Sequence, residues 1–303
     1  MGMGSTVKAT ARRLHAAVLL LAVTLTVQCR AAENLATIPL AYFGLHIHRA
    51  DQGTPWPNVP FGSWRLWDAY VTWADIQPAP DRWEFQRLDR YVALAQQHGT
   101  EILLPLANTP GWAASRPDEL SAYKPGNASE PKQIEDWRRY VKAVAERYRG
   151  KIRDFEIWNE PNIRHHYSGS MQKLVELACE ASRIVKAVDP ANRIVSPGAS
   201  AGAKGHIAYL DEFLSAGGRD CVDIVAHHFY VPNSPPEAMI PLIRQVRGVM
   251  LKHQLQDRPL WNTETGWWIA NGDGTPEHQM VAKGGWKKLA GTEEAGDYAR
   301  RAG

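Results

Sequence analysis

Residues 154–162 read DFEIWNEPN, a short apolar segment that ends in an Asn-Glu-Pro sequence containing Glu160. A run of four to eight mainly apolar residues bounded by turn-forming residues is typical of a buried strand. The arrangement returns at residues 259–264 (PLWNTE), where an apolar segment ends near Glu264. Both segments therefore predict buried strands with chemically capable side chains at their carboxyl ends.

The chain on either side of these segments alternates between short apolar runs and longer amphipathic stretches. Gly99 and Gly150 follow two of the amphipathic stretches, where glycine is typical of a helix end. Strands that alternate with helices predict parallel βα units and an α/β fold. The expected strands span residues 42–48, 63–68, 101–106, 154–158, 193–196, 222–226 and 259–263, and the expected helices span residues 85–98, 131–148, 171–188, 207–215 and 237–253.

Two architectures fit this alternation, an open doubly wound sheet and a closed (β/α)8 TIM barrel. Nearly every expected strand ends in polar side chains, and a barrel gathers all carboxyl ends of its strands at one mouth, whereas an open sheet uses only a switch point. The pattern therefore favours the barrel. Only seven strands can be placed, and residues 266–303 read as a Gly-rich loop and the start of a helix. We expect a barrel truncated after strand seven, without strand eight, although an atypical segment could fill the gap.

Composition is that of a globular protein. The 303 residues are 44% hydrophobic and 22% charged, which excludes a disordered tail, a collagen-like fibre and a disulfide-dense miniprotein. The formal charge is 35 − 32 = +3, but residues 1–31 hold four basic residues and no acidic one, so the remainder carries 31 − 32 = −1. The charge gives no reason to expect a nucleic-acid partner.

The N-terminus resembles a targeting segment. A basic start precedes an apolar run at residues 16–27, whose twelve residues would rise about 18 Å as a helix, too short to span a membrane core of about 30 Å. We predict a signal peptide at 1–31, a catalytic domain at 32–303, and a secreted or periplasmic protein. A lipoprotein anchored at Cys29 fits less well because Gln28 precedes the cysteine, and a buried N-terminal helix is a further alternative. No other stretch is long and apolar enough to span a membrane.

Two cysteines, Cys179 and Cys221, remain after residue 31. They could pair in an oxidising compartment, but two free buried thiols are the expectation favoured here.

Glu160 and Glu264 follow the fourth and seventh expected strands, which lie nearly across a barrel from each other. Two carboxyl groups that face each other across a sugar-sized cleft are what glycoside hydrolysis needs. One must be protonated to give a proton to the leaving oxygen, and the other must be ionised to attack the sugar. We expect a separation of about 5–5.5 Å, the spacing of a retaining enzyme.

These motifs resemble those of the clan A glycoside hydrolases, and residues 43–95 resemble family 39 and its relatives. The resemblance covers about residues 40–270 and implies a retaining mechanism with Glu160 as general acid/base and Glu264 as nucleophile. It further implies that Asn159 binds the sugar 2-hydroxyl, Tyr230 orients the nucleophile, and His228 lines the pocket. The family also has an aromatic residue after strand eight, which puts the activity of a chain without that strand in doubt.

Other side chains at the strand ends suit a sugar. The aromatic rings could stack on apolar sugar faces, with core packing as the alternative for each ring. His46 and His48 alternate along the first strand and would both face inward. Arg65 could pair with Glu264 and keep it ionised, or face outward. The tryptophans expected near the mouth are Trp67, Trp112, Trp158, Trp261, Trp267 and Trp268.

Three competing patterns are weaker. Residues 198–202 (GASAG) match the G-x-S-x-G motif of serine hydrolases around Ser200, but the next helix begins too late for a tight elbow. The histidine pairs at 165–166 and 227–228 lack zinc-site spacing, so we expect no metal and no cofactor. Asn127 begins an N-glycosylation sequence.

The sequence thus predicts a secreted retaining glycosidase that cleaves a β-linked oligo- or polysaccharide. An inactive or carbohydrate-binding relic of the same barrel is the alternative, followed by a serine hydrolase using Ser200.

Overall fold

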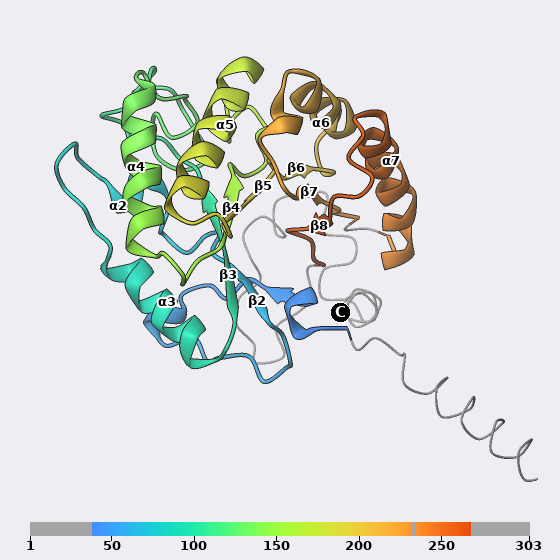
Figure 1. Ribbon diagram of the computed structural model, residues 1–303, viewed down its shortest axis with the longest axis horizontal. Helices are drawn as coiled ribbons and strands as arrows, with labels where there is room; N and C mark the ends of the chain where they lie inside the picture. Colours follow the sequence, from blue (N-terminus) through green and yellow to red (C-terminus); the bar gives the residue numbers. More distant parts are fainter. Residues whose placement is uncertain (1–37, 232–233, 268–303) are drawn as a thin grey trace, which may run out of the picture. The chain divides into compact units, whose positions relative to one another are not determined.

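The computed structural model describes residues 38–231 and 234–267 (Figure 1). The chain divides into two compact units, Met1–Pro39 and Leu40–Gly303, and the helices and strands belong to the second. The predicted signal peptide, Cys29, the expected strand eight and the predicted truncation lie outside the described residues. In the described part of the chain, every helix is too short or too polar to cross a bilayer.

The strands are short and all six strand pairings are parallel, which confirms the predicted α/β class. One sheet has the order β1-β2-β3-β4-β5 and the other β6-β7-β8. Chain order therefore equals spatial order throughout. The strands are β1 (Gly44–Leu45), β2 (Ser63–Arg65), β3 (Glu101–Leu106), β4 (Asp154–Ile157), β5 (Arg193–Val195), β6 (Ala199–Ser200), β7 (Val225–His228) and β8 (Leu260–Asn262).

Three strands differ from the expectation. β6 (Ala199–Ser200) was not predicted; it is separated from β5 by Pro197, which has no N–H to give to a ladder. β7 begins three residues later than the predicted strand at 222–226. The first expected strand is reduced to two residues, since Leu40–Tyr42 forms a 3-10 helix and His48 lies in the turn beyond β1. The apolar run at 42–48 was thus a poor guide, and Tyr42 is in fact 76% exposed.

The helices lie on the outer side of the strands (Figure 1). Ser170 caps α5 by accepting from the Lys173 N–H, and Thr72 with Asp75 forms a capping box on α2. Gly99, with φ +64°, follows α3 as predicted. The helices are α2 (Trp73–Ile76), α3 (Gln86–Gln97), α4 (Ile134–Arg147), α5 (Met171–Val188), α6 (His206–Ser215) and α7 (Met239–Lys252), with 3-10 turns at Ala50–Gln52, Gly218–Asp220 and Pro236–Ala238.

Side chains from strands that are not hydrogen-bonded to each other pack together in the interior of the molecule. Leu103 of β3, Val195 of β5 and Ala226 of β7 form one buried cluster, against which Trp261 of β8 packs. A parallel bridge between Val195 and Ile224 also joins the two sheets. The strands therefore curve around a common interior, and their carboxyl ends converge.

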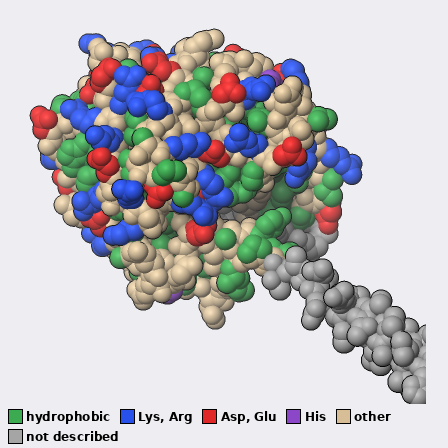
Figure 2. Space-filling model, in the orientation of Figure 1, with side chains coloured by type: hydrophobic (Ala, Val, Ile, Leu, Met, Phe, Trp, Pro, Cys, Tyr) green, Lys and Arg blue, Asp and Glu red, His purple; other side chains and the backbone are tan. Residues whose placement is uncertain are grey.

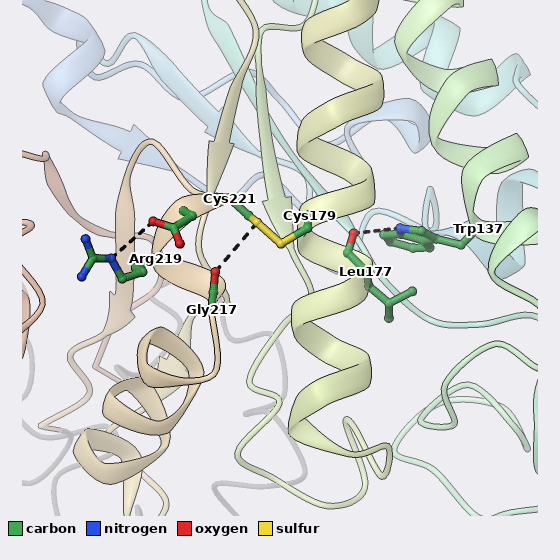
Figure 3. The surroundings of a disulfide bond; sticks show 7 residues. Trp137, Leu177, Cys179, Gly217, Arg219 and Cys221 are labelled. Carbon is green, nitrogen blue, oxygen red and sulfur yellow. Dashed lines mark hydrogen bonds and ion pairs between the residues drawn. A yellow bond between two sulfur atoms is a disulfide. The ribbon is translucent and has the colours of Figure 1, made fainter.

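The cysteine expectation was wrong. Cys179 on α5 and Cys221, directly after Gly218–Asp220, form a disulfide with a Cα–Cα distance of 4.8 Å (Figure 3). Both residues are only partly buried. Their separation of 42 residues did not reveal that this turn packs against α5. On the other side of α5, the Trp137 indole N–H of α4 donates to the Leu177 carbonyl at 3.0 Å.

The surface shows no segregation of charge on the face drawn in Figure 2. Lys and Arg side chains are interspersed there with Asp and Glu.

Candidate active site

The predicted site residues gather at the carboxyl ends of four strands. Arg65 and His228 are the last residues of β2 and β7, while Glu160 and Glu264 follow β4 and β8. A carboxylate oxygen of each glutamate and a ring nitrogen of His228 all lie within 4.8 Å of one another. Glu160 is 9% exposed, and the Glu264 side chain is 18% exposed. Two carboxyl groups therefore meet in a largely buried place that solvent still reaches.

Arg65 holds three of the surrounding groups. Its Nη1 donates to Glu264 Oε2 at 2.7 Å, its Nη2 donates to Asn159 Oδ1 at 2.7 Å, and its Nε donates to Glu156. The residue is 3% exposed, so its inward orientation resolves the alternatives that the sequence left open. A buried guanidinium is stable only when it is paired. Arg65 thus fixes Asn159 and Glu264 relative to each other.

Glu264 is built to stay ionised. Burial alone raises the pKa of its carboxyl, but the positive charges of His228 and Arg65 outweigh burial and lower the pKa to about 2. The Tyr230 hydroxyl contributes by donating to Glu264 Oε1 at 2.7 Å. Arg65 and Tyr230 therefore each hold one oxygen of this carboxylate.

Glu160 has different neighbours. Nδ1 of His228 lies 3.1 Å from Oε1 of Glu160, and Nδ1 of His166 lies 3.4 Å from Oε2. Burial lowers the pKa of His228, but the neighbouring carboxylates of Glu156 and Glu160 produce a net rise. No guanidinium is within ion-pair distance of Glu160 among the described residues.

The backbone after β4 is strained in order to place Glu160. Trp158 and Glu160 adopt left-handed φ values of 61° and 45°, which non-glycine residues rarely take. The Glu160 N–H donates to the Gly198 carbonyl at 3.1 Å. A Cβ at Gly198 would come within 2.4 Å of His228 Nε2, so the loop after β5 can approach the site only through a glycine.

Ser200 and Asn162 connect the loops behind Glu160. The Ser200 N–H donates to Asn162 Oδ1 at 2.9 Å, and Asn162 Nδ2 donates to the Ser200 carbonyl at 3.1 Å. Ser200 is 3% exposed within β6, and α6 begins only at His206. This differs from the exposed strand-to-helix turn that a nucleophilic serine requires.

The two histidines after β1 separate. Nε2 of His46 lies 3.2 Å from the Thr263 carbonyl, which ties the end of β1 to the segment after β8. Burial, followed by the charge of Arg65, lowers the pKa of His46 to about 4. His48 is exposed in the turn beyond the strand, so the expectation that both imidazoles face inward from a strand was wrong.

The expected tryptophan platform is mostly packing. Trp67 is 5% exposed, with the Arg65 guanidinium carbon 5.7 Å from the centre of its ring. Trp112 donates to the Gln77 carbonyl and packs edge-on against Trp73. The half-buried Trp267 donates to the Ser234 carbonyl at 3.0 Å. Trp158 is fully buried, Trp261 packs against the interior cluster, and Trp268 lies outside the described residues.

Glu156 supports the site but was not predicted from the sequence. Glu156 lies fully buried within β4, where its Oε1 accepts from the Thr263 hydroxyl at 2.9 Å. Burial raises its pKa, but the charge of Arg65 and the nearby His228 lower it overall. An acidic residue between Phe155 and Ile157 was the available signal, because a buried carboxylate needs a cationic partner.

Glu160, His228 and Glu264 are also a donor set that could hold a metal ion. Arg65 already supplies Glu264 with a positive charge at 2.7 Å. The sequence-based expectation of no metal therefore stays a prediction.

Residues 70–278 match the family described as Glycosyl hydrolases family 39. The chain belongs to this family. A curated relative, a beta-xylosidase of Geobacillus stearothermophilus, is 29% identical over 204 residues, which are 58% of this chain and 39% of that protein.

Solved structures share the fold. A monomeric beta-xylosidase from Caulobacter crescentus CB15 has a TM-score of 0.56 at 23% identity, covering 68% of this chain and 46% of that one. A family 39 glycoside hydrolase from the gut symbiont Bacteroides cellulosilyticus WH2 has a TM-score of 0.57 at 19% identity, covering 78% and 51%. The chain thus spans about half the length of these family members or less.

Proposed function

We propose that this family 39 chain is a retaining β-glycosidase in which Glu264 is the nucleophile and Glu160 the general acid/base. The observation that carries the proposal is the approach of the two carboxylates, with oxygen atoms within 4.8 Å of each other. This is near the separation of about 5–5.5 Å that leaves room for an anomeric carbon but not for an additional water.

The surroundings support the assignment of roles. Glu264 receives Arg65 and Tyr230 and has a pKa of about 2, as a nucleophile ionised at neutral pH requires. Glu160 has no guanidinium partner among the described residues. Its Oε1 lies 3.1 Å from His228, and its Oε2 lies 3.4 Å from His166, an imidazole whose pKa is lowered by burial.

In the first step, Glu264 bonds to the anomeric carbon while Glu160 gives its proton to the departing glycosidic oxygen. In the second step, Glu160 takes a proton from water, the water oxygen bonds to the anomeric carbon, and Glu264 leaves. Asn159, fixed by Arg65, would hydrogen-bond the sugar 2-hydroxyl beside the nucleophile. His228 would contact the sugar between the two carboxylates.

A β-xyloside is the substrate we propose, because the curated relative is named a beta-xylosidase. We further propose a (β/α)8 barrel, supported by the meeting of β3, β5 and β7 side chains in one interior cluster. Export from the cytosol is supported by the predicted signal peptide at 1–31 and by the Cys179–Cys221 disulfide, since disulfides persist mainly in oxidising compartments.

The first test replaces each carboxylate of the full chain. Glu160→Gln and Glu264→Gln should each reduce kcat/KM for phenyl β-xyloside, whose leaving group needs protonation, by on the order of 10⁴-fold, as loss of a catalytic residue does elsewhere. Glu146→Gln, on the exposed face of α4, is the control and should retain wild-type rates. Full activity in either site variant, with the control unchanged, would reject the proposal.

A further inference from the structure

His166 lies beside Glu160 and contacts neither Glu264 nor Arg65 in any ion pair or hydrogen bond of the described residues. Its Nδ1 is buried and has no hydrogen-bond partner among the described residues, while it lies 3.4 Å from Oε2 of Glu160. A buried polar atom without a partner costs stability unless some state of the protein satisfies it.

The position of His166 is well fixed. Its carbonyl accepts from the indole N–H of the fully buried Trp158 at 2.8 Å, and its own N–H donates to the Ile163 carbonyl at 2.8 Å. The Tyr123 ring lies against the imidazole, with a centroid distance of 5.9 Å. The ring is therefore held beside Glu160 by a loop that begins in the Asn-Glu-Pro motif itself.

We propose that His166 is a positioning residue, whose unprotonated Nδ1 accepts a hydrogen bond from the protonated Oε2 of Glu160 and so keeps the general acid in its proton-carrying form. The inference rests on the proposed function. Catalytic hydrogen bonds are often long in the unliganded state and shorten in the complex, so 3.4 Å suits this role. The proton remains on Oε2 until it passes to the leaving oxygen, and His166 keeps its own protonation state throughout.

The charges around the pair agree with a neutral imidazole. Burial lowers the pKa of His166, which outweighs the opposing effects of Glu160, Glu264 and Asp68, while His228 lowers it further. Oε1 of Glu160 faces Nδ1 of His228, whose N–H would favour the ionised carboxylate. The two histidines thus have opposite effects on Glu160: His228 stabilises the ionised carboxylate, and His166 stabilises the protonated carboxylic acid.

The test compares His166→Phe, which removes both ring nitrogens, with His166→Asn, which keeps a polar atom near Nδ1. His165→Phe, on the exposed neighbouring residue, is the control. Losing the acceptor should make the proton leave Oε2 of Glu160 more readily. The basic limb of kcat/KM in His166→Phe should therefore move to lower pH by about one unit, the size expected for one hydrogen bond.

A comparison of kcat/KM between a poor and a good leaving group separates the two roles, because a purely structural defect would lower both values equally. In His166→Phe, kcat/KM for phenyl β-xyloside should fall about tenfold at the basic limb, while that for 2,4-dinitrophenyl β-xyloside, which needs little protonation, should stay within about twofold. His166→Asn should restore most of the loss. An unmoved basic limb, or equal losses on both substrates, would overturn the inference.

Glu160→Ala separates failure of this inference from failure of the function. If Glu160→Ala hydrolyses both substrates at wild-type rates, the proposed function is wrong. If Glu160→Ala loses only the phenyl substrate while His166→Phe behaves as wild type, only the role of His166 is wrong. A ¹³C NMR titration of the Glu160 carboxyl, with a midpoint lowered by about one unit in His166→Phe, checks the same claim without turnover.

Discussion

Glu160 and Glu264 are the same residue type, and each follows the carboxyl end of a parallel strand, β4 and β8 respectively, yet their surroundings differ. Glu264 receives a guanidinium and a phenol hydroxyl, each donating to one carboxylate oxygen. Glu160 lies between two imidazoles, at 3.1 Å and 3.4 Å. A donor with a permanent charge stabilises only the ionised carboxylate, whereas an imidazole can donate or accept. The hydrogen-bonding and charged partners of each glutamate, rather than its position in a motif, therefore determine which one suits the role of nucleophile and which one the role of acid.

Replacing the buried Arg65 should have the largest effect on the difference between the two glutamates. Arg65→Met leaves Glu156 and Glu264 without their cation, and removing one member of a buried ion pair typically costs about 3–5 kcal/mol. We expect the free energy of unfolding, measured by urea denaturation, to fall by this amount. Arg138→Met on α4, which breaks a partly exposed pair with Glu180, should cost much less, because water screens such pairs. Equal losses in the two variants would contradict the proposed importance of the buried pairing.

Tyr230 allows a smaller change on the nucleophile side. Tyr230→Phe removes the hydroxyl that donates to Glu264 Oε1 and keeps the ring. The folded-state pKa of Glu264 is depressed to about 2, so ionisation persists down to low pH and is lost as the pH falls through that value. Without the hydroxyl that pKa should rise by about one unit. The acid limb of kcat/KM should move upward while the basic limb stays in place. Movement of the basic limb instead would assign Tyr230 to Glu160.

Much of the fold was predictable because hydrophobic pattern and strand ends are local features. α5 at Met171–Val188 and β3 at Glu101–Leu106 have the predicted bounds. Errors arose where the outcome depended on contacts between distant segments. The unpredicted strand β6 is defined by its pairing with β7, and Cys221 meets Cys179 only because a 3-10 turn packs against α5.

The site residues also fall into two groups, those that local motifs predict and those that depend on tertiary contacts. Glu160 and Glu264 were recognisable from their motifs, whereas Glu156 and His166 depend on side-chain directions that spacing does not encode. The tryptophans show the reverse error. The number of tryptophans suggested a surface on which a sugar could stack, but rings such as Trp158 are fully buried in the core. Aromatic content alone cannot distinguish a ring that fills the interior from one that lines a cleft.

The most direct measurement of the central claim is trapping of the covalent intermediate. A 2-deoxy-2-fluoro-β-xylosyl fluoride should inactivate the full chain, because fluorine slows the second step more than the first. Intact-mass spectrometry should then show one added fluoroxylosyl group, and peptide mapping should place it on Glu264. Attachment to another residue, or turnover of an aryl β-xyloside to the inverted α-anomer without any adduct, would contradict the account.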